Sequence, residues 1–257
     1  MKILGIETSG TIGGIALVSE RGIIITRTFK TGMKHGKELI PAIKDTLSEI
    51  KWTLKDIGLI AVDVGPGSYT GLRIGVTCAK TLAFALNIPV ADVPIFDIIA
   101  ENYVLNSLTY QKARNEKEIE SQWEKNITKE FFICPVFDAR RKHVYACVYK
   151  CVRLYSGQNS VTIQKTKSSD FLVIRPEDLV PALPRPAIIF GDGVLPYKDI
   201  FQKDDIFTDK EQKAIPKPEH VALLGEKMYL SGHRCDINKL SPIYLCKAEA
   251  LEKKEGK

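Results

Sequence analysis

The chain has 257 residues, 44% of them hydrophobic, and a formal net charge of +6. This is enough to bury the core of one large or two small domains, and the mild charge allows contact with RNA without indicating it. The sequence shows neither a signal peptide nor a transmembrane-length apolar run. Its six cysteines have no C-x-x-C spacing, so we expect a reduced, cytoplasmic protein without a membrane segment.

In its first hundred residues the sequence predicts three strands, then helices and strands in alternation. Short apolar runs bounded by turn residues indicate the strands, and apolar residues at helical spacing indicate the helices. Thr53 and Asp56 form a capping-box pattern before the fourth strand. The expected strands are 2–9, 13–18, 23–29, 59–62 and 89–93, and the expected helices are 38–50, 72–86 and 95–104.

A glycine-rich turn, GPGSYTG at residues 65–71, joins the fourth strand to the second helix. Unpaired amides and the helix dipole attract anions at a helix N-terminus, so one interpretation is an anion-binding turn. The other interpretation is a tight structural connection. The turn has neither the Gly-Lys-Ser/Thr of a Walker loop nor the usual spacing of a dinucleotide-binding loop.

The second half of the chain echoes the first after a charged stretch. Residues 106–130 alternate in charge sign and hold little apolar sequence, which predicts a solvated insertion at a domain boundary. We therefore expect an N-terminal lobe at 1–105 and a C-terminal lobe at 131–257. In the second lobe the expected strands are 131–137, 144–153 and 187–190, with turns at 138–140 and 191–193, a short helix near Tyr197 and a helix at 219–230.

Two lobes of the order β-β-β-α-β-α-β-α describe the α/β actin–hexokinase–Hsp70 architecture, in which each lobe is ribonuclease H-like. The motifs also resemble the TsaB family of bacterial proteins, once called YeaZ, which is required to form threonylcarbamoyladenosine in tRNA. The resemblance spans most of the chain except the insertion, and GPGSYTGLRIG is its most specific element. The other elements are LGIETSGTIGGIALV, Asp-Ala-Arg at 138–140, Gly-Asp-Gly at 191–193 and Pro-Ile-Tyr-Leu at 242–245.

The resemblance implies a non-catalytic subunit. TsaB is a paralogue of TsaD, the metal-dependent subunit that transfers threonylcarbamoyl to the adenosine beside the anticodon, and the ATPase TsaE joins the two. The expected partners are therefore a TsaD-like paralogue in a heterodimer, a TsaE-like ATPase in a larger complex and a second copy of this chain in isolation. Contact with tRNA is expected only indirectly.

No catalytic or metal-binding residues are expected. The resemblance implies that TsaD holds its metal on an H-x-x-x-H pair, whose places fall here at Ile95 and Ile99. Isoleucine coordinates no metal, and the four histidines of the chain have no such spacing. No arrangement of serine, cysteine or histidine predicts a nucleophile, since the glycine-rich turn lacks the G-x-S-x-G order.

Acidic residues after the expected strands suggest a vestigial nucleotide or anion cleft between the lobes. In the alternative interpretation these carboxylates cap turns or pair with Arg73 and Arg140. We favour this alternative and predict no cofactor, because the length of Glu7 and the bulk of Ile12 hinder a phosphate. The cleft candidates are Glu7, Gly67, Ser68, Asp138 and Asp192.

The helix at 72–86 is apolar over about 220° of its circumference, about twice the width that one sheet-facing stripe requires. Leu72, Val76, Ala79 and Ala83 form one side, which we expect to pack on the sheet. The other side is expected to contact a partner together with the neighbouring helix, unless the whole helix is buried in its own fold. The predicted interface residues are Leu39, Ile43, Leu47, Ile74, Cys78 and Leu82.

The sequence thus predicts a dimerisation or scaffold subunit that supports a TsaD-like transferase in tRNA modification. Two alternatives remain open: a stand-alone ATP-dependent phosphotransferase or ATPase of the same architecture, and a tRNA-binding module. ATP turnover by the isolated chain would favour the first alternative. Tight, salt-dependent binding of tRNA without partners would favour the second.

Overall fold

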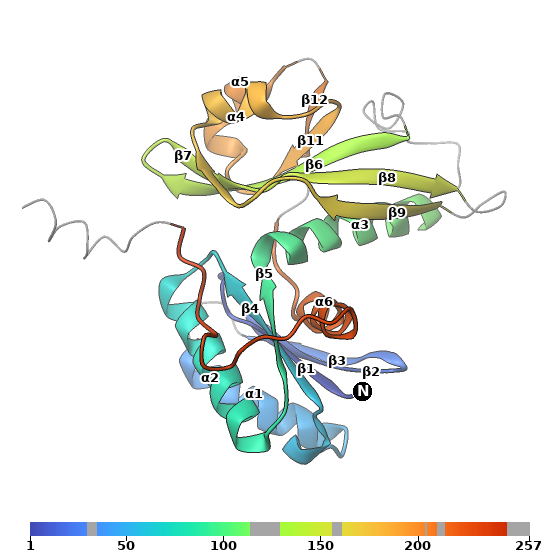
Figure 1. Ribbon diagram of the computed structural model, residues 1–257, viewed down its shortest axis with the longest axis vertical. Coiled ribbons are helices and arrows are strands. Elements are labelled where there is room, and N and C mark those ends of the chain that lie inside the picture. The colour runs from blue at the N-terminus through green and yellow to red at the C-terminus, as the bar shows by residue number, and fades with distance from the viewer. Residues whose placement is uncertain (30–34, 114–128, 156–160, 204, 210–213, 246–257) are drawn as a thin grey trace, which may run out of the picture. The chain divides into compact units, whose positions relative to one another are not determined.

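A computed structural model describes residues 1–29, 35–113, 129–155, 161–203, 205–209 and 214–245 (Figure 1). The chain divides into two compact units, each described here by itself. The first unit comprises Met1–Ile99 and Ile215–Tyr244, and the second comprises Ala100–Ala214 and Leu245–Lys257. The division differs from the predicted C-terminal lobe, 131–257, because residues 215–244 pack with the first unit.

A five-stranded sheet with strand order β3-β2-β1-β4-β5 forms the first unit. The first three strands pair antiparallel, whereas β4 and β5 run parallel to β1. The predicted order β-β-β-α-β-α-β-α of this lobe is confirmed. Its elements are β1 (Ile3–Glu7), β2 (Gly14–Ser19), β3 (Gly22–Thr28), α1 (His35–Glu49), a 3-10 turn (Leu54–Asp56), β4 (Leu59–Gly65), α2 (Tyr69–Leu86), β5 (Val90–Pro94) and α3 (Ile95–Ala113), whose later part belongs to the second unit.

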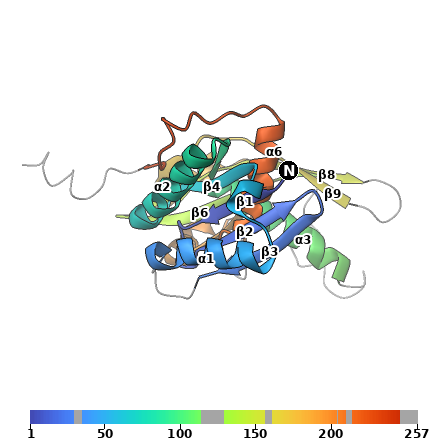
Figure 2. The same cartoon turned by 90° about the horizontal axis from the view of Figure 1, so that it is seen from below.

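Helices α1 and α2 cover one face of this sheet (Figure 2). The predicted core side of α2 is confirmed, since Leu72, Val76, Ala79 and Ala83 are all buried. The helix ends as expected at Asn87, which adopts a left-handed conformation with φ of 53°.

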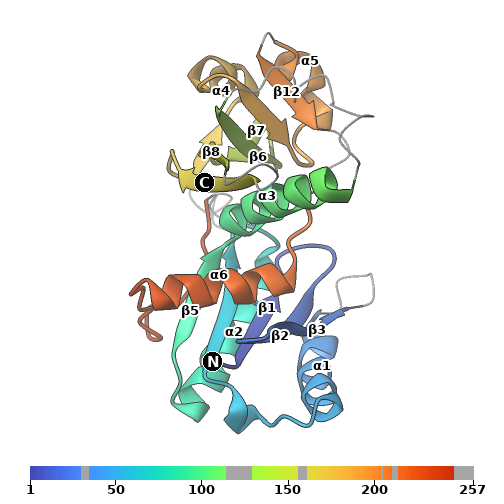
Figure 3. The same ribbon diagram turned by 90° about the vertical axis from the view of Figure 1, so that its right-hand side faces the viewer.

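Helix α6 (Pro218–Leu230) covers the opposite face of the same sheet (Figure 3). Two glycines let its backbone approach the strands. A Cβ atom on Gly225 would lie 2.4 Å from the Cβ of Ala61, and one on Gly5 would lie 2.5 Å from the Pro218 carbonyl oxygen. The predicted helix at 219–230 is therefore present, but it completes the core of the first unit.

After α6 the chain crosses α2 as an irregular segment that contains turns, residues 231–244, here called the strap (Figure 1). The amide of Ile243 donates to the carbonyl of Val64 at 2.7 Å. Lys80 of α2 donates to the carbonyl of Asn238 at 3.1 Å, and His233 contacts Asp92 of β5 at 2.6 Å. These contacts hold the strap on the first unit.

The second unit repeats the strand order of the first, with β10-β7-β6-β11-β12 in place of β3-β2-β1-β4-β5. This repetition, with helices packed on the sheet, confirms the predicted actin-like fold class. Its elements are β6 (Glu130–Arg140), β7 (His143–Ala146), β8 (Tyr149–Tyr155), β9 (Val161–Lys167), β10 (Leu172–Ile174), α4 (Pro176–Ala182), β11 (Ala187–Phe190), a 3-10 turn (Leu195–Tyr197), α5 (Lys198–Phe201) and β12 (Ile206–Asp209).

Two local predictions for this unit are wrong. The expected single strand at 144–153 is broken into β7 and β8, because Val148 donates its amide to the Ser169 side chain instead of to the sheet. The expected turn at 138–140 lies within β6, and the chain turns at residues 141–142 instead.

The predicted charged insertion, 106–130, is described only at its ends. Residues 106–113 extend α3, and residues 114–128 lie outside the described residues. Within the part of the chain that the structure describes, no helix is both long and apolar enough to cross a membrane.

Candidate functional site

The glycine-rich turn packs tightly against the loop that follows β1. A Cβ atom on Gly71 would lie 1.9 Å from the Thr8 carbonyl oxygen, and one on Gly75 would lie 2.2 Å from Thr8 Oγ1. A Cβ atom on Gly67 would lie 2.7 Å from the Cβ of Ser9. The glycines therefore leave room for residues 8–9 to pack directly against the turn.

Amides at the start of α2 are already paired within the protein. The amide of Ser68 donates to the Ser9 carbonyl at 2.9 Å, and that of Gly71 donates to Ser68 Oγ at 3.3 Å. The amide of Leu72 donates to the Ser68 carbonyl at 2.9 Å. These three amides are therefore not available to an anion, which needs donors that face outward.

Beneath this turn lie two neighbouring carboxyl groups, those of Glu7 and Asp63, at the ends of parallel strands β1 and β4. Both side chains are fully buried. The Ser9 hydroxyl lies 2.6 Å from Glu7 Oε1 and 2.6 Å from Asp63 Oδ2. A hydroxyl carries one proton and can donate only once, so one of the two carboxyl groups must donate to it and is protonated.

Burial explains why one of these two carboxyl groups keeps its proton. Removal from water disfavours the charged form and raises the pKa of Glu7 to about 8, with repulsion from Asp63 adding to the effect. Burial also raises the pKa of Asp63 to about 6. Glu7 Oε1 further accepts the amides of Ser9 and Gly10, whereas Glu7 Oε2 is buried without a hydrogen-bond partner.

This pair does not fit the metal–phosphate site that actin-like nucleotide-binding proteins would need. Mg²⁺ is bound by ionised oxygens, but here burial raises the pKa of both carboxyl groups, and Glu7 Oε1 and Asp63 Oδ2 are already hydrogen-bonded to Ser9. Within the described residues, no group of three or more His, Cys, Asp and Glu side chains is placed to hold a metal ion.

The two remaining acidic candidates belong to the second unit. The amide of Asp138 donates to Asp192 Oδ1 at 3.1 Å, and the amide of Arg140 donates to Asp138 Oδ1 at 2.9 Å. Asp138 also forms an ion pair with Arg140 at 3.7 Å. The alternative that these acids cap turns thus agrees with the local geometry of Asp138 and Asp192, and Arg73 lies over the ring of Tyr69.

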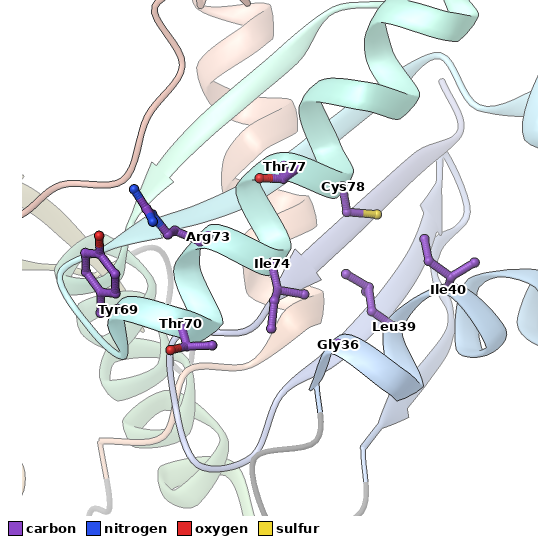
Figure 4. Close-up of a pocket in the computed structure, with 9 residues that line it drawn as sticks. All are labelled: Gly36, Leu39, Ile40, Tyr69, Thr70, Arg73, Ile74, Thr77 and Cys78. Carbon is purple, nitrogen blue, oxygen red and sulfur yellow. The ribbon is translucent and has the colours of Figure 1, made fainter.

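A groove of about 540 Å³ opens between α1 and α2 on the surface of the first unit (Figure 4). Its lining is mostly apolar, with Tyr69 and Arg73 at one end. Tyr69 packs against Tyr244 of the strap, with ring centroids 5.2 Å apart. The lining residues are Gly36, Leu39, Ile40, Tyr69, Thr70, Arg73, Ile74, Thr77 and Cys78.

The predicted interface residues divide between this groove and the core. Ile74 and Cys78 line the groove, and Leu82 is half-buried beside the core. On α1, Leu39, Ile43 and Leu47 are only 1%, 4% and 4% exposed, so they pack into their own unit and leave almost no surface for a partner. Leu39 nevertheless lines the groove, and the expectation that these three residues form an interface stays a prediction.

The most exposed apolar residues of α1 and α2 are not among the predicted interface residues. Ile40 of α1 is 56% exposed and Phe84 of α2 is 80% exposed. In the sequence Ile40 lies next to the apolar stripe of α1, so spacing alone gave no reason to single it out. Tyr244 was missed for another reason, because only the fold brings the strap to α2.

Comparison with known proteins places the chain among tRNA-modification proteins. It is 30% identical to tRNA threonylcarbamoyladenosine biosynthesis protein TsaB of Bacillus subtilis, over 98% of this chain and 97% of the relative. It is 23% identical to the protein of the same name in Escherichia coli, over the full length of both.

Two further comparisons concern parts of the molecule or its fold. The sequence model of the family described as TsaD, tRNA N6-adenosine threonylcarbamoyltransferase, matches residues 29–116. The solved structure of YeaZ from Pseudomonas aeruginosa is similar in fold, with a TM-score of 0.68 and 24% identity, covering 95% of this chain and 99% of that chain.

Proposed function

The chain belongs to the TsaB family, and from this premise we propose that it is an accessory subunit that supports a TsaD-like transferase and performs no chemistry of its own. It is a subunit for the biosynthesis of threonylcarbamoyladenosine in tRNA. The observation that carries the proposal is the full-length similarity to TsaB proteins together with an exposed apolar groove on α1 and α2.

A non-catalytic role is supported by the residues at the places where TsaD is expected to hold its metal. Ile95 and Ile99 begin α3, and both side chains are buried in the first unit. The Glu7–Asp63 pair is also sealed under residues 8–9 and shares a proton. Neither place offers ionised ligands to a reacting group.

A TsaD-like chain is the occupant we propose for the groove between α1 and α2. The TsaD sequence model matches residues 29–116, which contain both groove helices. A TsaD-like partner would therefore present a related helix pair, and two related surfaces can meet about a pseudo-twofold axis. A second copy of this chain could use the same surface, so homodimer and heterodimer would compete for it. A TsaE-like ATPase would join the assembly elsewhere.

Reconstitution tests the subunit role. Unmodified tRNA, threonylcarbamoyl-adenylate and the TsaD-like and TsaE-like proteins are combined with or without this chain. We expect modification, measured by mass spectrometry of tRNA nucleosides, only when the chain is present. Full modification in its absence would contradict the proposal.

A matched pair of substitutions tests the groove. Ile40→Arg places a charge in the groove at a side chain that is 56% exposed, and Leu230→Arg places one on α6, where the side chain is 73% exposed. Neither residue is buried, so both variants should fold. We expect Ile40→Arg, and likewise Cys78→Arg, to weaken binding to the TsaD-like partner at least tenfold in calorimetry, because a charge in an apolar contact is left unpaired. Leu230→Arg should bind like the parent.

A further inference from the structure

At the tip of the β6–β7 hairpin in the second unit the chain carries four consecutive basic residues, Arg140, Arg141, Lys142 and His143. The first three side chains are exposed, and Arg140 is 88% exposed. Asp138 pairs with Arg140 at 3.7 Å, which is a weak ion pair for so exposed a cation, and Asp192 also attracts Arg140 electrostatically. The tip therefore keeps a net positive charge.

The backbone at this tip is unusual. Arg140, Arg141 and Lys142 have φ values of 66°, 49° and 62°, so three successive residues are left-handed. A turn of this shape favours glycine, asparagine or aspartate, because a larger side chain strains the backbone there. Three long cations in these places are poorly explained by the turn itself, and strained backbone of this kind is concentrated at functional sites.

Neighbouring strands extend the basic surface on one face of the sheet. Val144 and Ala146 of β7 face the core with α4, so the alternation of a strand directs His143 and Tyr145 to the opposite face. On β10, Val173 pairs with Tyr145 and is exposed. Arg175 is exposed and directly follows Ile174, the partner of Val144, at the end of β10. Phe137 pairs with Tyr145 on the same face.

We propose that this surface, formed by Arg140, Arg141, Lys142 and Arg175 beside Tyr145, contacts the phosphate backbone of RNA. The inference rests on the proposed function, in which the complex acts on tRNA. Separated cations on a hairpin suit successive phosphates, and an aromatic residue beside them suits an unpaired base. An acidic protein would use the cations but gives no reason for the aromatic neighbour.

The test uses two double variants of the full chain. Arg141→Asn with Lys142→Asn removes two charges from left-handed positions at the tip. Lys51→Asn with Lys55→Gln removes two exposed charges from the first unit, where Lys51 is also left-handed with φ of 57°. Asparagine tolerates this conformation, so both variants should melt at the same temperature as the parent or slightly higher.

Binding of an unmodified tRNA transcript is measured by fluorescence anisotropy from low to moderate salt, with the chain alone and in complex with its TsaD-like partner. We expect the tip variant to lose affinity about tenfold at low salt, and the slope of log K against log salt to fall by about 1 to 2. The Lys51–Lys55 variant should match the parent.

Equal tRNA affinity of the tip variant and the parent, or equal losses in both variants, would overturn the inference. So would a tip variant that binds tRNA normally but fails to assemble with a protein partner. A duplex DNA of matched charge is measured in parallel, and tighter binding to it than to tRNA would overturn the assignment to RNA. The proposed function is judged separately, by whether modification requires the chain, so either idea can fail without the other.

Discussion

The two units share one strand order but treat the ends of their central strands differently. In the first unit, Glu7 is the last residue of β1 and Asp63 lies two residues before the end of β4, and both are buried beneath residues 8–9. In the second unit, Asp138 and Asp192 lie near the corresponding ends of β6 and β11 and keep contact with water. Each unit thus has two acidic residues near the ends of its two central parallel strands. Whether these residues are buried or exposed depends on the residues that follow the first of those strands.

The burial of the acid pair in the first unit, and the exposure of the acids in the second, affect which surfaces each unit can offer to a partner. The first unit closes its acid pair by packing α2 on the Thr8–Ser9 loop, and its proposed partner surface is the groove between α1 and α2. The second unit leaves its acids at the base of an exposed basic hairpin. Three predictions probe this difference, beginning with the largest expected effect.

The closure of the first unit should fail in Gly71→Ala. The new Cβ would lie 1.9 Å from the Thr8 carbonyl oxygen, so the turn and α2 must move apart. We expect a loss of about 3 kcal/mol in the free energy of unfolding, typical of overpacking against rigid surroundings. Urea unfolding can be followed by the fluorescence of Trp52 in a Trp123→Phe background, which leaves Trp52 as the reporter of the first unit.

Gly36→Ala is the matched control in the same unit. Its new Cβ would lie 3.4 Å from Ile74 Cδ1, an ordinary contact, and alanine favours a helix over glycine. This variant should be as stable as the parent or slightly more stable. If Gly71→Ala were also tolerated, the acid pair could not be sealed by the contact between α2 and residues 8–9.

The sealed acid pair should make the first unit less stable as the pH rises. Unfolded Glu7 releases its proton near pH 4.5, whereas the folded side chain holds it up to about pH 8. A raised pKa in the folded state contributes stability at low pH, and this contribution is lost between about pH 4.5 and 8. Each unit of pKa difference corresponds to about 1.4 kcal/mol.

Glu7→Gln removes that titration. The difference in unfolding free energy between pH 5 and pH 8 should shrink by at least about 1.4 kcal/mol relative to the parent, the equivalent of one pKa unit. Asp45→Asn, which changes an exposed acid of α1, should leave the parental difference in place. A parental pH dependence in Glu7→Gln would show that Glu7 is ionised in the folded protein at neutral pH.

Much of this fold could be predicted because the signals are local. Apolar runs, Asn87 and the Thr53–Asp56 capping box fix the elements of the first unit, and the Thr53 amide does donate to Asp56, at 2.8 Å. The core side of α2 also followed from helical spacing alone. In these cases the residues that decide the structure are neighbours in the chain.

The features that could not be predicted depend on contacts between residues that are far apart in the sequence. The helix at 219–230 was predicted, but its place depends on Gly5 and Gly225, whose close contacts join distant parts of the chain. The partner of Glu7 was missed because Asp63 becomes its neighbour only through the pairing of β1 with β4. An apolar stripe such as Leu39, Ile43 and Leu47 looks the same in sequence whether it faces a core or a partner, and in the structure all three are buried in the first unit.

The smallest effect is expected in the second unit, from Asp192→Asn. Asparagine retains the oxygen that accepts the Asp138 amide, so the free energy of unfolding should change by less than about 0.5 kcal/mol. The substitution removes a negative charge near Arg140, and the affinity for tRNA should rise about twofold at low salt. Burial raises the pKa of Asp192 above its usual range.

Asp192→Ala separates charge from hydrogen bonding at the same position. It removes the charge as well, so its affinity for tRNA should match that of Asp192→Asn, but it leaves the Asp138 amide without its acceptor and should cost about 1 kcal/mol of stability. Parental affinity in both variants would show that Asp192 does not act on the basic tip. The open acids of the second unit would then differ from the sealed pair of the first in exposure alone.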